Sequence, residues 1–243
     1  MELTVAIRSY PGVAPRVLLR HALVAVDVIR ATTTAVTAVA AGRRCYPVTS
    51  VEAARRVASE VPDALLVGEL GGVMPEGFHL NNSPADLAAR HDHHPVVLLS
   101  SSGTQLMHEV RQSDAAFAAC FRNTSATIRR LAQCRLPAVV IGAGTRGEFR
   151  EEDQMCCAWI AAGLLECGYV PADGETAHLV ERWHGASPRD FLGSPSVEYL
   201  RRTEQLRDLA FILDHFDDAG CACRIAGEQV VIDPSPASLP ATQ

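Results

Sequence analysis

The sequence predicts an α/β protein in which a largely parallel sheet is flanked by helices. Apolar runs of strand length alternate with segments of helical periodicity along most of the 243 residues. This alternation is typical of parallel strands connected by crossover helices. Hydrophobic residues make up 48% of the chain, which is enough for one large core or two modest ones.

Seven apolar runs have the length of buried strands. They lie near 2–8, 22–27, 45–48, 64–68, 95–100, 115–121 and 137–142. Helical patterns fall near 31–42, 50–61, 102–112, 123–134 and 150–166, and a more helical, arginine-rich stretch covers 176–216. The segment "ACRIAGEQVVI" then predicts a hairpin. We expect a single domain over 1–233 and a disordered Pro/Ser tail over 234–243.

Two segments of the chain resemble each other. "RATTTAVTAVA", which begins at Arg30, is similar to "RNTSATIRRLA", which begins at Arg122, and each follows an apolar strand. A duplication would give two related αβ halves, about 1–114 and 115–233, whose strand ends share one cleft. The match is short, so convergence stays open as the alternative.

Composition excludes several classes of protein. The net charge is −6 and the arginines are dispersed, so we expect no basic face for nucleic acid. No segment approaches the roughly 18 apolar residues of a membrane span, and "MELTVAIRSY" does not resemble a signal peptide. We therefore expect a cytoplasmic protein without nucleic-acid or membrane partners, and leave a homo-oligomer open. The chain has no lysine, so fixed positive charge must come from arginine or a metal.

The eight cysteines do not indicate a disulfide framework or a zinc site. No C-x-x-C pair occurs, and most of them lie in apolar segments, where cysteine packs as a small hydrophobe. The tract "HDHH" at 91–94 directly precedes Pro95 and a predicted strand. A polar connecting loop is therefore favoured there over a set of metal ligands.

Polar side chains follow several predicted strands at the point where each strand ends. Asp27 and Arg30 close the first such run, and Thr32, Thr33 and Thr34 open the helix that follows. Ligands of open α/β sheets bind at the carboxyl ends of strands, where free helix N–H groups favour anions. An N-cap beside a solvated ion pair explains the same residues and stays open.

Two further strand ends repeat this pattern. Glu69 lies between glycines in "LLVGELGG", and "SSSGT" at 100–104 follows the run "VVLL". Glycine allows the backbone to approach a ligand closely, and hydroxyl groups donate to phosphate-like oxygens. Each motif alone also fits an ordinary turn. Their recurrence at strand ends predicts a site for a small anionic substrate.

The segment "VVIGAGTRGEF" has the G-x-G-x-x-G spacing of a dinucleotide-binding loop. Its glycines are Gly142, Gly144 and Gly147, between a predicted strand and a predicted helix. The helix start that follows carries several carboxylates, which would repel a pyrophosphate unless a cation stood between them. A cation shared between acidic side chains and an anionic substrate is therefore favoured over nicotinamide binding.

Five blocks of the chain resemble the 2-phosphosulfolactate phosphatase (ComB-type) family. They are "DVIRATTTAVTAVAAG", "GELGGVMPEGFHLNNSP", "SSSGT", "FRNTSA" and "GAGTRGEFREEDQMCCAWIAAG", in that family's order between Asp27 and Gly163. The resemblance implies a ComB-like α/β fold and a magnesium-dependent phosphatase. It further implies that 2-phospho-3-sulfolactate is hydrolysed to sulfolactate and phosphate, a step toward coenzyme M.

The expected cofactor is Mg²⁺, held by carboxylates and waters against the substrate phosphate. We expect Asp27, Glu69 and Asp153 as metal ligands because each stands at a predicted strand end or helix start. Arg30 should act with Asp27 as a catalytic residue by gripping the substrate in fork geometry. Whether Asp27 is a ligand, the nucleophile or the base stays open. The expected substrate-binding residues are Thr32, Thr33, Thr34, Ser101, Ser102, Gly103, Thr104, Arg122, Asn123, Gly144 and Gly147.

Two positions depart from the family pattern. Leu70 stands where the family usually has an arginine, and Ser102 stands where it has an asparagine. The reaction type is therefore better supported than the sulfonated substrate. Two alternatives remain: a nucleotide-binding oxidoreductase that uses the loop of Gly142, Gly144 and Gly147, and a non-catalytic anion-binding protein of the same fold.

Overall fold

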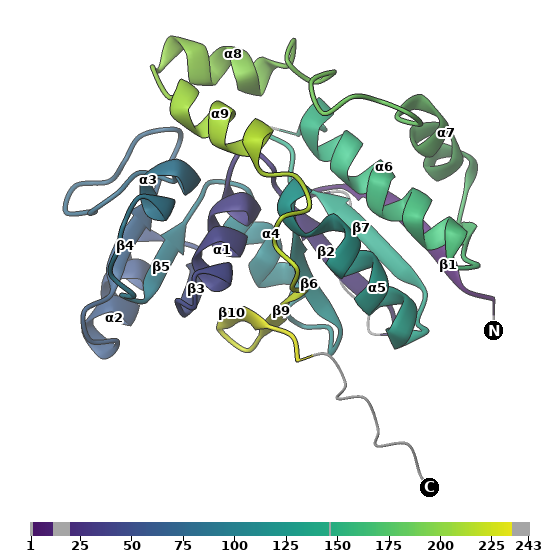
Figure 1. The fold of residues 1–243 in the computed structure, drawn as a ribbon. Helices are drawn as coiled ribbons and strands as arrows, with labels where there is room; N and C mark the ends of the chain where they lie inside the picture. Colours follow the sequence, from purple (N-terminus) through teal and green to yellow (C-terminus); the bar gives the residue numbers. More distant parts are fainter. Residues whose placement is uncertain (1, 12–19, 146, 235–243) are drawn as a thin grey trace, which may run out of the picture.

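The computed structural model describes residues 2–11, 20–145 and 147–234. Their strands form one sheet of ten strands flanked by helices (Figure 1). This arrangement confirms the predicted α/β class. Of the tail expected at 234–243, residues 235–243 lie outside the described residues.

The elements follow the predicted alternation of strands and helices. The strands are β1 (Thr4–Ser9), β2 (Ala22–Val26), β3 (Cys45–Val48), β4 (Leu65–Gly68), β5 (Val96–Leu99), β6 (Ala116–Ala119), β7 (Ala138–Gly142), β8 (Val170–Pro171), β9 (Cys223–Ala226) and β10 (Gln229–Ile232). The helices are α1 (Ala31–Ala40), α2 (Val51–Glu60), α3 (Pro84–Ala88), α4 (Gly103–Val110), α5 (Thr124–Cys134), α6 (Glu151–Glu166), α7 (Gly174–Arg182), α8 (Pro195–Arg202) and α9 (Leu206–Asp214).

Two groups of parallel strands make up most of the sheet. Their orders are β4-β5-β3 and β6-β2-β7-β1-β8. The hairpin of β9 and β10 lies between the groups, because β10 pairs antiparallel with β3 and β9 pairs antiparallel with β6. The hairpin predicted from the sequence is thus confirmed, and it joins the two groups into one sheet.

The division considered at about residue 114 is not a boundary in this sheet. Strands β1 and β2 pair with β7, and β2 also pairs with β6. Strands from 1–114 and from 115–233 therefore satisfy each other's backbone hydrogen bonds.

Alternate residues of β2 face two different hydrophobic clusters. Leu23 and Ala25 belong to the cluster that contains residues of α1 and α4. Val24 and Val26 belong to the cluster that contains residues of α5 and α6. A strand buried on both faces has no polar positions, which explains why the run "LVAV" is apolar throughout.

Three strand ends are closed by side chains of the helix that follows. The Thr32 hydroxyl accepts from the Asp27 N–H and donates to the Asp27 carbonyl, both at 2.8 Å. The Thr104 hydroxyl accepts from the Ser100 N–H at 2.9 Å and donates to its carbonyl at 2.7 Å. After β6, the amide of Asn123 takes this place. These side chains satisfy buried backbone groups where the strands stop.

The sequence does not predict α3. Its five residues are too few to show a helical period. The local signal is a capping residue followed by proline: Ser83 accepts from the Asp86 N–H at 3.1 Å, and Pro84 occupies the first helical position.

Helices α8 and α9 lie over α1 and α3 (Figure 1). Asp208 of α9 is 2% exposed. Its Oδ2 accepts from Arg30 Nη1 at 2.5 Å, and its Oδ1 accepts from the Ser83 hydroxyl at 2.6 Å. Because a buried carboxylate is stable only when paired and hydrogen-bonded, this network attaches α9 to the starts of α1 and α3.

Two expectations from the composition can be compared with the described residues. No helix among them has the length and apolar character needed to cross a membrane. All eight cysteines are free, and five of them are buried. This agrees with cysteines that pack as small hydrophobes. The tract "HDHH" lies in the connection between α3 and β5, as predicted.

Ile225→Ala should lower the free energy of unfolding by about 2–5 kcal/mol. Ile225 is 4% exposed and lies in the hairpin that joins the two groups of strands. Urea unfolding followed by circular dichroism measures the change. Ile232→Ala is the matched control in the same hairpin, where the side chain is 48% exposed, and should cost less than about 0.5 kcal/mol. Equal effects of the two changes would contradict a central, buried hairpin.

Candidate active site

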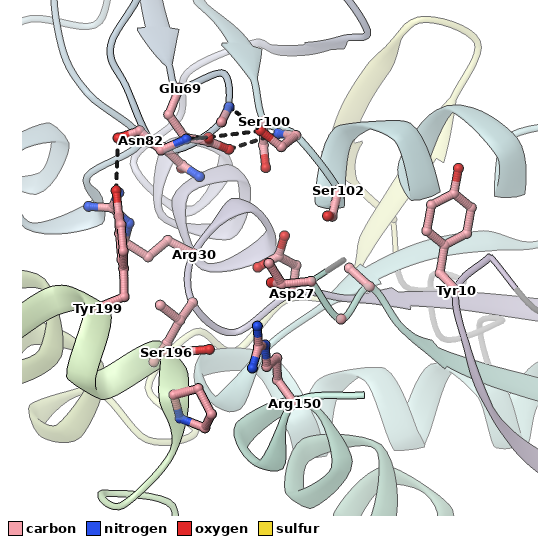
Figure 2. A pocket seen from close by; sticks show the side chains of 18 of the residues that line it. Tyr10, Asp27, Arg30, Glu69, Asn82, Ser100, Ser102, Arg150, Ser196 and Tyr199 are labelled. Atoms are coloured by element: carbon pink, nitrogen blue, oxygen red, sulfur yellow. Dashed lines mark hydrogen bonds between the residues drawn. The ribbon is translucent and has the colours of Figure 1, made fainter. Parts of the chain in front are cut away.

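A cavity of about 650 Å³ opens where the carboxyl ends of β2, β4, β5 and β7 meet. The first turn of α8 lines its opposite wall. Asp27 lies near the centre of the view in Figure 2. The lining residues that follow strand ends include Asp27, Glu69, Ser100, Ser101, Ser102 and Gly144.

Asp27 is a buried carboxylate that faces this cavity. Asp27 is 6% exposed. Burial raises its pKa to about 7, the charges of Glu69 and Glu152 act in the same direction, and the N–H of Ala31 and the charge of Arg30 act against them. Removing a carboxylate from water disfavours its charged form. Ionised Asp27 is therefore favoured when a cation lies beside it.

Gly103, the first residue of α4, packs directly against Asp27. A Cβ atom at this position would lie 2.1 Å from Asp27 Oδ2 and 2.6 Å from the Cβ of Ala31. Gly103 is buried and does not line the cavity. The absence of a side chain allows the N-terminus of α4 to approach Asp27.

Asp153 holds the ends of β2 and β7 together. Its Oδ1 accepts from the Val28 N–H at 2.8 Å, and its Oδ2 accepts from the Gly144 N–H at 3.1 Å. Burial raises its pKa well above the usual value, and the charges of Asp27 and Glu152 raise it further. Asp153 is buried behind the cavity wall and is absent from its lining.

Glu69 connects the ends of β4 and β5. Its Oε1 accepts from the Ser101 N–H at 2.7 Å. Its Oε2 accepts from the Ser101 hydroxyl at 2.9 Å and from the Gly72 N–H at 2.6 Å. Glu69 lines the cavity, but both of its oxygens are already used by the neighbouring loops.

The three expected metal ligands do not form a common site. Over the part of the chain that the structure describes, no group of three or more acidic, histidine or cysteine side chains is placed to hold a metal ion. Glu69 and Asp153 each use both carboxylate oxygens to hold loops at strand ends. Mg²⁺ is commonly bound through one or two carboxylates, with waters and substrate phosphate completing its coordination. Asp27, buried and facing the cavity, fits that kind of binding.

Arg30 reaches the cavity but pairs with α9 and not with Asp27. Its Nη1 donates to Asp208 Oδ2 and to Gln205 Oε1, both at 2.5 Å. The side chains of Arg30 and Asp208 are 4% and 3% exposed. Neither Nη2 nor Nε of Arg30 donates to a described residue. These nitrogens remain available to a ligand in the cavity that Arg30 lines.

The three threonines after β2 hold the turn and lie outside the cavity lining. Thr32, Thr33 and Thr34 are at most 1% exposed. Thr32 closes the strand end as described above, while Thr33 donates to the Val28 carbonyl and Thr34 donates to Asn82 Oδ1, both at 2.8 Å. In this geometry the three hydroxyls donate to protein atoms.

The hydroxyl-rich turn after β5 divides into two parts. Ser100, Ser101 and Ser102 line the cavity, whereas Thr104 is 0% exposed and bonds to the Ser100 backbone. Ser102 is the N-cap residue of α4, yet its side chain makes no capping hydrogen bond. Its hydroxyl and the free N–H groups in the first turn of α4 are suited to an anion. Thr104, in contrast, is a structural residue.

Arg122 and Asn123 also lie outside the cavity lining. Nε and Nη2 of Arg122 donate to the two carboxylate oxygens of Asp218 at 2.9 and 2.8 Å, and Nη1 donates to the Thr37 hydroxyl at 2.8 Å. Asn123 is buried and closes the end of β6. The similarity between the turns at Arg30 and Arg122 therefore does not bring both arginines into one cleft.

The glycine-rich loop after β7 reaches the cavity without the features of a dinucleotide-binding loop. Gly144 and Gly147 are lining residues. The N–H of Gly144 is taken by Asp153, so it is not free for a pyrophosphate. At Gly142, a Cβ atom would lie 2.2 Å from Phe149 Cε2, because the aromatic ring packs on the backbone. These contacts disfavour the nucleotide-binding alternative.

The sequence does not single out several residues that line the cavity. They are Tyr10, Asn82, Arg150, Ser196, Tyr199 and Arg202. Arg150 directly precedes a predicted helix and lies within a block of the family resemblance. This position is the sequence feature that could have identified it as a site residue. The α8 residues had none, because only the fold brings α8 to the cavity. There the Tyr199 hydroxyl donates to the Gly72 carbonyl at 2.8 Å.

Comparisons with known proteins indicate the family of this chain. A family model described as 2-phosphosulpholactate phosphatase matches residues 11–216. A protein of Synechococcus sp. (strain CC9605), named "Probable 2-phosphosulfolactate phosphatase", is 32% identical over 219 residues, which are 87% of this chain and 88% of that protein.

Two further relatives carry the same name. The protein of Deinococcus radiodurans is 35% identical over 178 residues, 70% of this chain and 72% of its own length. The protein of Pseudothermotoga lettingae is 36% identical over 146 residues, 60% of this chain, and the chain spans 63% of that relative. With the family match extending over most of its length, the chain belongs to the 2-phosphosulpholactate phosphatase family.

Proposed function

We propose that this protein is a magnesium-dependent phosphatase that hydrolyses the phosphomonoester of a small 2-phospho-hydroxy acid. The first candidate substrate is 2-phospho-3-sulfolactate, which would yield sulfolactate and phosphate. The observation that most supports this proposal is the position of Asp27, a buried carboxylate with a pKa of about 7 that faces a cavity beside the N-terminus of α4. Membership of the family and the names of the relatives support the same reaction.

The residues around Asp27 suit a phosphate group. The Ser102 hydroxyl and the first N–H groups of α4 can donate to phosphate oxygens. The nitrogens of Arg30 that have no described partner can add charge-assisted hydrogen bonds. Hydrolysis breaks the bond between phosphorus and the ester oxygen. Water supplies the hydroxyl that joins phosphorus and the proton that leaves on the 2-hydroxy acid.

Mg²⁺ fits beside Asp27, where an ionised carboxylate is otherwise disfavoured by burial. When bound, the ion would neutralise the phosphate and polarise its oxygens. Asp27 would hold it, while Glu69 and Asp153 keep the strand ends in place. The non-catalytic anion-binding alternative predicts binding without hydrolysis, so the assay below distinguishes the two.

Asp27→Asn should abolish phosphate release from 2-phospho-3-sulfolactate, because a neutral amide is a poor ligand for Mg²⁺. Inorganic phosphate is measured with Mg²⁺, after EDTA treatment and after Mg²⁺ is restored. Activity should disappear with EDTA and return with the metal. Asp63→Asn is the control: Asp63 is exposed and has φ 57°, a conformation that asparagine tolerates. Full activity in EDTA or in Asp27→Asn would contradict the proposal.

Ser102→Ala should lower activity, whereas Thr104→Val should lower stability. Loss of the Ser102 hydroxyl should lower kcat/KM by roughly tenfold or more, the value of one hydrogen bond to a charged group, with little change in stability. Loss of the Thr104 hydroxyl should instead lower the free energy of unfolding by about 1–3 kcal/mol, because it leaves buried backbone groups of Ser100 unpaired. Steady-state kinetics and urea unfolding of both variants test this contrast, and it is wrong if Ser102→Ala only destabilises the fold.

Asp27→Asn should also stabilise the metal-free protein, and more so at pH 8 than at pH 4. The pKa of Asp27 rises from 3.8 to about 7 on folding, so the folded state binds the proton more tightly than the unfolded chain. Stability is therefore lost as the pH rises between these two values, and asparagine removes that loss. Calorimetric melting of EDTA-treated wild type and variant at both pH values measures it. An equal shift at pH 4 and pH 8 would rule out this ionisation as the cause.

A further inference from the structure

Arg150 lines the cavity together with Arg30 and Arg202, and part of its guanidinium has no partner among the described residues. The side chain is 13% exposed and lines the cavity. Its Nη1 donates to Glu148 Oε2 at 2.7 Å. Its Nε is buried and has no hydrogen-bond partner among the described residues. A buried donor without an acceptor is unfavourable, so Arg150 has hydrogen-bonding capacity that the described residues do not use.

The charge of Arg150 is also less well balanced than that of Arg30. Arg30 pairs with Asp208, and both side chains are almost fully buried. Arg150 pairs with Glu148, whose side chain is 70% exposed. Because solvent screens an exposed carboxylate strongly, Arg150 keeps more of its positive charge toward the cavity.

The position of Arg150 separates it from the serines that suit the phosphate. Figure 2 shows Arg150 and Ser196 on one side of Asp27, and Ser100 and Ser102 on the other. Ser196 lies in the first turn of α8 and lines the cavity. The Ser196 hydroxyl hydrogen-bonds to the buried carboxyl of Glu152, so the guanidinium of Arg150 is the donor on this side of Asp27.

A purely structural explanation of Arg150 accounts for less. Burial raises the pKa of Glu152, while hydrogen bonds from Ser196 and Ser194 and the charge of Arg150 act against that rise, so the arginine offsets some of the buried negative charge. This explains why a cation is present. It does not explain why the Nε donor lacks an acceptor at a cavity wall.

We propose that Arg150 provides a subsite for a second anionic group of the substrate, a carboxylate or a sulfonate, apart from the phosphate position at Ser102. The proposal rests on the proposed function. The expected ligand is a small phosphomonoester with at least one further fixed negative charge.

The test compares wild type and Arg150→Gln on four phosphomonoesters with Mg²⁺ present. They are 2-phospho-3-sulfolactate, 2-phospholactate, 2-sulfoethyl phosphate and ethyl phosphate. We expect kcat/KM to fall at least tenfold, mainly through KM, for esters that carry the group bound by Arg150, and less than threefold for ethyl phosphate. A loss confined to the sulfonated pair identifies a sulfonate, and a loss confined to the carboxylated pair identifies a carboxylate. An equal loss on ethyl phosphate, or no loss on any ester, would overturn the subsite.

A binding measurement separates this inference from the proposed function. Calorimetric titration with sulfolactate, which has no phosphate to hydrolyse, should give a Kd at least tenfold weaker for Arg150→Gln than for wild type. If sulfolactate binds in this way but no ester is hydrolysed, the proposed function fails and the subsite stands. If esters are hydrolysed but both proteins bind sulfolactate equally, the subsite fails and the function stands.

Two further variants control for folding. Arg201→Gln changes an arginine of α8 that is 50% exposed, pairs with Glu198 and is absent from the cavity lining, so its kinetics and Kd should match wild type. Arg150→Lys keeps the positive charge near Glu152 but lacks the planar fork of arginine. It takes the place of Arg150→Gln if the glutamine variant melts at a lower temperature. Wild-type discrimination among the four esters in Arg150→Lys would also overturn the subsite.

Discussion

The cavity depends on how the strands end. A strand that stops inside a protein leaves N–H and C=O groups that must still be hydrogen-bonded. Here side chains meet that need: Thr32 after β2, Thr104 after β5 and Asn123 after β6 each bond to the backbone at the end of the preceding strand. Carboxylates then tie neighbouring ends together. The polar character of this region is therefore largely structural, and only part of it is left for a ligand.

The carboxylates at the strand ends illustrate this division. Asp153 accepts two backbone N–H groups, and Glu69 accepts two backbone N–H groups and one hydroxyl. The oxygens of both carboxylates are thus hydrogen-bonded to the loops that they hold. Asp27 and Asp153 are both buried and both have a raised pKa, but of the two only Asp27 lines the cavity. A buried carboxylate with a raised pKa at a cavity is typical of a functional position. The same residue types therefore have different functions because their neighbours differ.

The C-terminal part of the chain completes both the sheet and the cavity. The β9–β10 hairpin joins two groups of parallel strands, and α8 and α9 lie over α1 and α3 (Figure 1). Asp208 of α9 pairs with Arg30, and α8 brings Ser196 and Tyr199 to the cavity wall. Because the chain has no lysine, its fixed positive charge is carried by arginines, and their pairing decides how much of that charge reaches the cavity. Arg30 and Arg150 differ in this respect although both line it.

Local sequence was sufficient to predict the α/β class, the principal strands and helices, the C-terminal hairpin and the concentration of polar residues at strand ends. Apolar runs and turn residues carry this information, because burial and backbone hydrogen bonding act over a few neighbouring residues. The tertiary structure alone decided which polar residues face the cavity. Thr33 and Ser102 occupy similar places in the sequence, yet Thr33 bonds to a carbonyl and Ser102 lines the cavity. Such a distinction depends on partners far along the chain, as the pairing of Arg30 with Asp208 shows, and no local pattern encodes which partner a buried polar group will find.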